Sequence, residues 1–178
     1  QAWALQHLSG GRFALGLGTQ VKGNVEKRFG MPWSAPIPRM RDYVGALRAI
    51  FACWQQGTPL HYESPSYTLT RMQPFFSPGP IEHPDLPILL GAVRPNAIRL
   101  AGEVADVVIT HPTNSGAEYL RAVVQPMVAD GEHAASRAPG SVRIVANPLV
   151  ATGPDHATVT RERKFRNGVQ ALDHPDKA

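Results

Sequence analysis

The sequence lacks the features that mark several common protein classes. Its 178 residues include one cysteine, Cys53, which excludes an internal disulfide framework and fits a reducing cytoplasm. It contains no signal-peptide pattern and no apolar run long enough to span a bilayer. We therefore expect a cytoplasmic protein that does not enter a membrane.

Signals for nucleic acids, metals and nucleotides are also missing. The net charge of +4 comes from scattered lysines and arginines without a dense basic run, which argues against a nucleic-acid partner. The seven histidines form no paired spacing such as HxxxH, so we predict no metal. Neither a Walker loop nor a nucleophile elbow occurs, and Gly16-Leu17-Gly18 lacks the third glycine of a dinucleotide fingerprint.

What the chain does have is a strand with one nearly bare face, from Arg12 to Gln20. Its alternate positions are bulky on one side (Phe13, Leu15, Leu17) and small on the other (Ala14, Gly16, Gly18). Glycine weakens a strand, and its presence often marks a place where a ligand or another backbone approaches closely. The bare face is therefore a candidate wall of a site.

Helices and strands alternate along the rest of the chain. Helices are predicted at Gln1 to Leu8 with Trp3, Leu5 and Leu8 on one side, from Arg39 to Trp54, from Pro95 to Glu103, from Ser115 past a kink at Pro126, and from Asp155. Further strands are predicted at Pro87 to Gly91, Asp106 to Thr110 and Val142 to Val150, the last interrupted by Asn147-Pro148. Ser115 and Glu118 have capping-box spacing. The alternation predicts an α/β fold with parallel strands, as an open sheet or as part of a barrel.

Two long segments interrupt this order, at residues 21–38 and 58–87. Both are rich in proline and glycine, and we expect long loop insertions there, the second with a short strand at Tyr67 to Thr70. Beyond Phe165 the apolar period fades, and Asn167 to Ala178 offers nothing that packs convincingly.

Three motifs resemble the bacterial luciferase-like monooxygenase superfamily. They are Leu8 to Thr19, Arg39 to Val44, and Leu90 through Asp106. Arg28 to Trp33 and Pro74 to Phe76 look closest to the branch that uses the deazaflavin coenzyme F-420. The resemblance implies a TIM-like (β/α)8 barrel, of which residues 1–178 form a single partial domain, the incomplete middle portion. Because two barrel edges would then be unpaired, we expect the isolated polypeptide to be unstable or inactive.

In such barrels the site lies at the C-terminal ends of the strands. This places Gly18, Thr19 and Gln20 near the segment from Gly91 to Asn96, where a helix N-terminus favours a phosphate. The resemblance implies that Gly91, Ala92, Val93, Arg94 and Asn96 belong to the cofactor's phosphate site, although a glycine before a helix can also be a plain connection. Relatives usually have glycine where Arg94 stands, and Arg94 could pair with a phosphate or obstruct it.

Other side chains near the strand ends have two interpretations each. Thr19 and Gln20 can hydrogen-bond a flavin edge or cap a turn. His111 is the candidate catalytic residue, as an acid or base, and the alternative is an ordinary histidine at a strand end. Glu26 can contact a ligand or remain an exposed loop carboxylate. Val107 stands where relatives commonly have glycine, which bears on local strand geometry.

The resemblance implies an oxidoreductase that transfers hydride between F-420 and a small organic substrate. The first alternative is an FMN-dependent monooxygenase that activates oxygen, and the second is a non-catalytic remnant or partner subunit. A full-length protein of this kind could also form a homodimer. The chain alone does not identify the substrate, because loops that select it would lie outside this portion.

Overall fold

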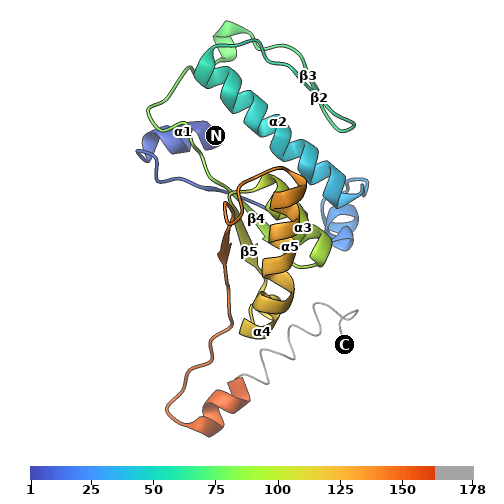
Figure 1. The fold of residues 1–178 in the computed structure, drawn as a ribbon, viewed down its shortest axis with the longest axis vertical. Helices are drawn as coiled ribbons and strands as arrows, with labels where there is room; N and C mark the ends of the chain where they lie inside the picture. Colours follow the sequence, from blue (N-terminus) through green and yellow to red (C-terminus); the bar gives the residue numbers. More distant parts are fainter. Residues whose placement is uncertain (163–178) are drawn as a thin grey trace.

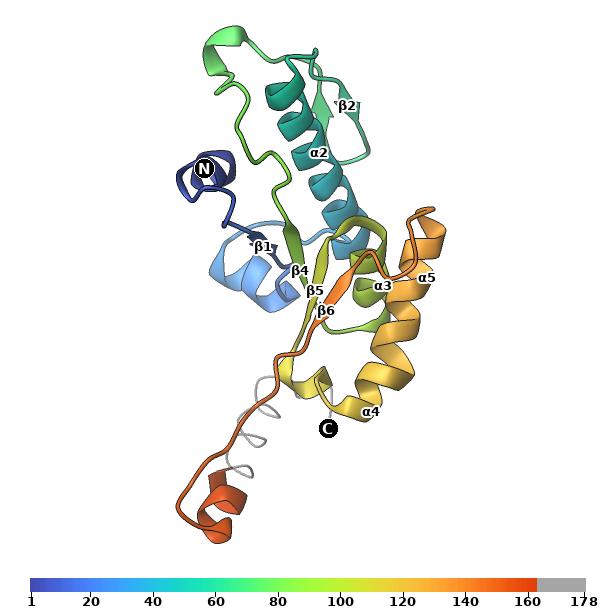
Figure 2. The ribbon, with the colours of Figure 1, turned by 60° about the vertical axis from the view of Figure 1, so that its left-hand side comes forward.

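A four-stranded parallel sheet forms the centre of the computed structural model, which describes residues 1–162. The strands are β1 (Leu15–Leu17), β4 (Ile88–Ala92), β5 (Val107–Thr110) and β6 (Arg143–Val145), side by side in the order β1-β4-β5-β6 (Figure 2). Each helical connection returns the chain to a parallel neighbour, as the alternation predicted. Within the described residues the sheet does not close, which is what an incomplete barrel would show.

The two faces of this sheet differ in burial. Helices α3 (Pro95–Val104) and α5 (Gln125–Ala134) cover one face (Figure 2), where Ile88, Leu90 and Val108 form the centre of the core. On the opposite face, Gly16, Gly91, Arg143 and Val145 are exposed. In a closed barrel this second face would be the interior. The strand pattern thus correctly separated a bulky packed side from a bare one.

Glycines allow α3 and α5 to cross at close range. A Cβ atom on Gly102 would clash with the backbone carbonyl of Val128, and one on Gly131 would clash with that of Arg99. No side chain fits at either position without moving a helix backbone. The pair therefore sets the distance between the two helices that cover the sheet.

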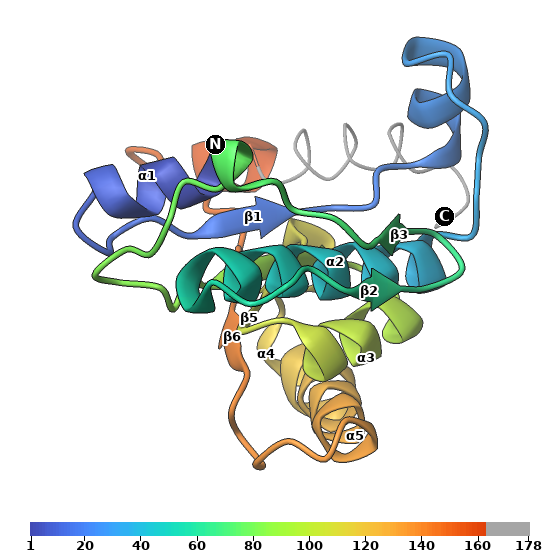
Figure 3. The same cartoon turned by 90° about the horizontal axis from the view of Figure 1, so that it is seen from above.

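Helix α2 (Pro36–Gln56) packs against α3 and carries the hairpin of β2 (Tyr62–Glu63) and β3 (Thr68–Leu69) (Figures 1 and 3). It begins three residues before the predicted Arg39, because the first turn needs no backbone N–H donors and so accommodates both Pro36 and Pro38. Its end at Gly57, which has a φ of 68°, is as predicted. The predicted loop 58–87 contains this hairpin and the short 3-10 helix η2 (Pro74–Phe76).

Helix α1 (Ala2–Leu8) exists as predicted, but its buried side is different. Trp3 and Gln6 are buried, whereas Leu8 is 80% exposed. The Trp3 ring stacks on Phe51 of α2 at 5.3 Å, and Gln6, one turn later, donates to the His83 carbonyl at 3.1 Å. Packing of the largest aromatic surface decides the rotation of this short helix, so the predicted Leu5 and Leu8 face was wrong.

The chain between β5 and β6 is irregular. After the 3-10 helix η3 (Pro112–Asn114) come α4 (Ala117–Tyr119), the π-helical turn η4 (Leu120–Val124) and then α5. Pro126, which lacks an N–H, is the second residue of α5 and lies two positions after the π turn ends, so the backbone is irregular close to the predicted kink. The predicted capping box is wrong, since Gly116 is the N-cap of α4 and no side chain of the described residues caps it.

The last predicted strand is shorter than expected. β6 ends at Val145 rather than Val150, because Asn147-Pro148 interrupts the ladder. Residues 156–162 are helical, close to the predicted start at Asp155, whose side chain accepts the Thr158 N–H at 2.7 Å. The predicted non-packing tail from Asn167 to Ala178 lies outside the described residues. Cys53, which lies in α2, is buried.

Candidate active site

The C-terminal ends of the four strands meet at one edge of the sheet. Leu17 lies beside Leu90, Ala92 beside Thr110, and Ile109 beside Val145. The segments that follow these strands are therefore neighbours at that edge, which is where parallel α/β folds place their sites. The structure thus brings the predicted segments Gly18–Gln20 and Gly91–Arg94 to the same edge.

The end of β1 turns sharply at Gln20. Gln20 has a φ of 59°, in the left-handed region that residues other than glycine seldom adopt, and its Oε1 accepts a hydrogen bond from Asn24 Nδ2 at 3.0 Å. A Cβ atom on Gly16 or Gly18 would meet nothing within 4 Å. The bare face therefore borders open space, and strain at its end is the kind of feature that gathers at functional sites.

The start of α3 has the chemistry of an anion site. Arg94 is its N-cap residue with an exposed side chain, and Pro95 occupies the first helical position. No side chain among residues 1–162 caps this helix, so the Asn96 N–H of the first turn and the helix dipole face outward. At Gly91 a Cβ would meet only the Leu17 carbonyl, at 3.7 Å. The Arg94 side chain and the Asn96 N–H fit a phosphate group. A larger residue would fit at Gly91, so packing does not explain the glycine there.

A hydroxyl network joins the ends of β5 and β6. Thr110 Oγ1 and Ser115 Oγ lie 2.6 Å apart and are both buried, and Ser115 donates to the His111 carbonyl at 3.0 Å. The Asn147 backbone N–H donates to Ser115 Oγ at 3.1 Å. Ser115 therefore fixes the strand ends rather than capping a helix. Its capping-box spacing gave no indication of this role, because the partner Asn147 is 32 positions away.

His111 follows β5 directly and begins η3. Its Nδ1 accepts the Thr113 backbone N–H at 3.3 Å and lies 2.9 Å from Thr113 Oγ1. The neighbouring loop is tied to β4, since Asn114 Nδ2 donates to the Val93 carbonyl. The orientation of the histidine ring is thus set by local hydrogen bonds.

Glu26 and Val107 have clear structural settings. Glu26 is exposed, as in one of its two interpretations, but it lies in the π-helical turn η1 (Asn24–Arg28) rather than in a loop, and it pairs with Lys22 at 3.9 Å. Val107 is buried and lies in register between Leu89 and Arg143. The strand therefore accommodates a β-branched residue where relatives commonly have glycine.

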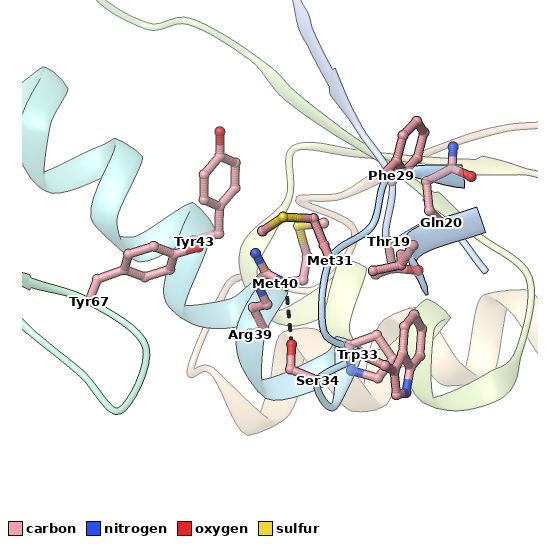
Figure 4. Close-up of a pocket in the computed structure, with 13 residues that line it drawn as sticks. Thr19, Gln20, Phe29, Met31, Trp33, Ser34, Arg39, Met40, Tyr43 and Tyr67 are labelled. Atoms are coloured by element: carbon pink, nitrogen blue, oxygen red, sulfur yellow. Dashed lines mark hydrogen bonds between the residues drawn. The ribbon is translucent and has the colours of Figure 1, made fainter. Parts of the chain in front are cut away.

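A cavity of about 280 Å³ opens beside the end of β1, and sequence reasoning did not find it. Thr19 and Gln20 line one side, and the remaining lining comes mostly from the segment 21–38 and α2 (Figure 4). Its aromatic and methionine lining consists of Phe29, Met31, Trp33, Met40, Tyr43 and Tyr67. We call it the Arg39 cavity, after the arginine that also lines it. The only available signal was the density of aromatic and methionine residues in a long loop.

Within residues 1–162, no three histidine, cysteine or acidic side chains gather where they could hold a metal ion. In the same part of the chain, no helix combines the length and apolarity needed to cross a membrane.

Comparison with known proteins was made with the whole chain. A family model described as luciferase-like monooxygenase matches residues 1–176. An uncharacterised protein of Mycobacterium tuberculosis is 42% identical over 87% of this chain and 45% of its own length. A putative coenzyme F-420-dependent oxidoreductase of the same species is 36% identical over 59% of this chain and 32% of its own. The chain thus spans less than half the length of these curated relatives.

Among solved structures, the chain is similar to an F-420-dependent secondary alcohol dehydrogenase in complex with an F-420–acetone adduct. The TM-score is 0.63 with 20% identity, over 79% of this chain and 40% of that one. At 20% identity this similarity shows a shared fold only. The shared fold agrees with an incomplete parallel barrel.

Proposed function

This chain belongs to the luciferase-like monooxygenase family, and we propose that it carries part of the active site of a deazaflavin-dependent oxidoreductase. In this proposal the full-length protein exchanges hydride between F-420 and a small organic substrate, such as an alcohol or an enone-like acceptor. The F-420-dependent relative supports this choice of cofactor. When bound, the coenzyme supplies the hydride chemistry, and the protein contributes binding and orientation.

The phosphate of the cofactor would bind at the start of α3. The exposed Arg94 guanidinium would pair with it, and the backbone N–H of Asn96 would point at it along the helix dipole. Gly91, Ala92 and Val93 would form the adjoining wall, which the Asn114 side chain holds in place. The observation that carries the proposal is this uncapped, arginine-bearing helix start at the same sheet edge as the bare end of β1.

The end of β1 would border the ring system of the cofactor. Gly18 leaves open space there, and Thr19 and Gln20 offer a hydroxyl and an amide that could hydrogen-bond a ring edge. On the other side of the edge, the His111 ring would act as the acid or base that exchanges a proton with a substrate oxygen. Ser115 would then act indirectly, because it holds the His111 carbonyl and the Asn147 N–H together.

Titration of the full-length protein with F-420 and, separately, with FMN tests the proposal. We expect saturable binding of F-420 and much weaker binding of FMN. Failure of both cofactors to bind would remove the enzymatic interpretation.

The alternative is an FMN-dependent monooxygenase. It is favoured by the description of the matching family, which names monooxygenases. FMN carries a terminal phosphate, so the same helix start would serve it. Tight FMN binding with oxygen consumption, and no binding of F-420, is the result that this alternative expects.

A further inference from the structure

The Arg39 cavity combines an apolar lining with one positive charge. Its lining includes four aromatic rings and two methionines, which suit a flat apolar body. Arg39 is the single charged residue among the described residues that line it, and none of these is acidic. Its Nη1 donates to Ser34 Oγ at 3.3 Å, which holds the guanidinium at the cavity (Figure 4).

The surrounding loop reinforces this positive charge. Residues 20–39 contain Lys22, Lys27, Arg28 and Arg39 against the single acid Glu26, and Lys22 pairs with that acid. Arg28 lies over the Phe29 ring at 5.5 Å. The local field therefore attracts anions and opposes the entry of cations.

The wall opposite β1 is held in place by α2. Tyr43 and Tyr67 contact each other with ring centroids 6.0 Å apart (Figure 4). The hairpin that carries Tyr67 is anchored twice on Asp42, whose carboxylate accepts the Ser66 N–H at 3.1 Å and whose carbonyl accepts the Tyr62 hydroxyl at 3.0 Å. A preformed wall of this kind reduces the ordering cost of binding a ligand.

We propose that the Arg39 cavity binds the substrate, and that the substrate is an organic carboxylate with a flat apolar body of about one ring. The carboxylate would pair with Arg39, since a single planar guanidinium matches a carboxylate in a bidentate manner. The apolar body would lie between Met31 and the Tyr43–Tyr67 pair, on either side of Arg39 in Figure 4. The assignment to substrate rests on the proposed function, because Thr19 and Gln20 border both this cavity and the proposed cofactor wall.

Calorimetric titration of the full-length protein with three probes tests this inference. The probes are 3-phenylpropionate, its uncharged analogue 3-phenylpropan-1-ol, and inorganic phosphate. We expect 3-phenylpropionate to bind at least about tenfold more tightly than the alcohol, because a charge-assisted hydrogen bond contributes roughly twice as much as a neutral one. Equal affinity for the acid and the alcohol, or a preference for phosphate, would overturn the carboxylate assignment.

Variants connect the binding to the cavity. Arg39→Gln should weaken 3-phenylpropionate binding about tenfold or more and change binding of the alcohol less than about twofold. The matched control is Arg12→Gln, an exposed arginine before the opposite end of β1, which should leave both affinities unchanged. Met31→Glu, at an exposed lining position, should abolish binding of the acid, whereas Met31→Gln should retain it. An Arg39→Gln protein that binds the acid normally contradicts the proposal.

Titration with F-420 on the same samples separates the two proposals. Binding of 3-phenylpropionate in the presence of saturating F-420 supports neighbouring sites. If F-420 competes with the acid and Arg39→Gln weakens both equally, the cavity belongs to the cofactor and the substrate assignment fails. If the acid binds with the expected Arg39 dependence while F-420 and FMN do not bind, the cavity is a carboxylate site and the proposed function fails instead.

Discussion

Arg41 donates two hydrogen bonds to one carboxylate oxygen of Glu103, from Nε at 2.8 Å and from Nη2 at 2.6 Å. The other oxygen accepts Arg99 Nη1 at 2.8 Å, and the Glu103 side chain is only 10% exposed. Two of the motifs that carry the family resemblance thus meet in space, since Arg41 lies in Arg39 to Val44 and Glu103 in Leu90 through Asp106. Their shared role is to attach α2 to α3.

Replacing Glu103 by glutamine should destabilise the full-length protein by about 1–2 kcal/mol, because it removes charge-assisted bonds and leaves Arg41 without its carboxylate. Arg99→Gln should cost less than about 0.5 kcal/mol, since Arg99 is half-exposed and forms an i,i+4 pair. Urea unfolding of both variants measures the difference. Equal effects of the two substitutions would contradict the claim that the Arg41–Glu103 bonds contribute more to stability than the Arg99–Glu103 pair.

Gly102→Ala should destabilise the protein by about 2–3 kcal/mol, because its Cβ would press against the Val128 carbonyl where α3 and α5 cross. Gly131→Ala should behave in the same way from the opposite helix. The matched control is Gly23→Ala, where a Cβ would meet nothing within 4 Å and the backbone is already helical. A thermal unfolding series in which Gly102→Ala matches Gly23→Ala would show that the helices can separate without cost.

The elements that the sequence predicted best are those whose signal is local. Continuous apolar runs marked β4 and β5 almost to the residue, proline marked the start of α3, and glycine marked the end of α2. Elements near the periphery were less well predicted. The rotation of α1 depends on Phe51, far along the chain, and the short extent of β6 depends on where its pairing with β5 stops.

The candidate site divides in the same way. Thr19, Gln20 and the segment from Gly91 to Asn96 follow strands, so the parallel topology alone predicted that they share an edge. The partners of Ser115 and the Arg39 cavity depend on contacts between distant loops, to which no periodic pattern corresponds. Residue type in a loop indicates chemistry there, but its partners follow only from the folded chain.

Glu132 should make the stability depend on pH in the acid range. Burial raises its pKa, but the N–H groups of Gly140 and Val142, the Ser141 hydroxyl and the Arg137 charge outweigh that effect, so the pKa lies below the ordinary 4.5. A lowered folded-state pKa means that the carboxylate stabilises the fold above about pH 4.5 and that this contribution is lost as the pH falls through the folded-state value.

The measurement is the free energy of unfolding against pH for the wild-type protein and for Glu132→Gln. The variant should be less stable by about 1–3 kcal/mol at pH 7, because the buried Val142 N–H and the Gly140 N–H lose a charged acceptor. Its deficit should shrink as the pH falls below 4.5, because the carboxylate of the unfolded wild-type chain then takes up a proton more readily than that of the folded chain. Glu118→Gln, an exposed helix position, is the control and should give a curve parallel to the wild type. A deficit that stays constant down to pH 3 would contradict the assigned role of the charge.

Arg94→Gly decides between the two roles that the sequence left open for this arginine. Arg94 is exposed and its backbone is extended, so the side chain does not fill the start of α3, and we expect a direct contact with the phosphate of the cofactor. The variant should therefore bind F-420 about tenfold more weakly in the full-length protein, measured by fluorescence titration. The affinity of Arg94→Lys for F-420 should lie between those of the wild type and Arg94→Gly, because lysine keeps the positive charge but lacks the planar guanidinium. Glycine is itself a good N-cap residue, so α3 should remain intact and the loss can be attributed to the guanidinium. Tighter binding by Arg94→Gly would instead mean that the arginine obstructs the backbone donors, and the anion site would then consist of the helix start alone.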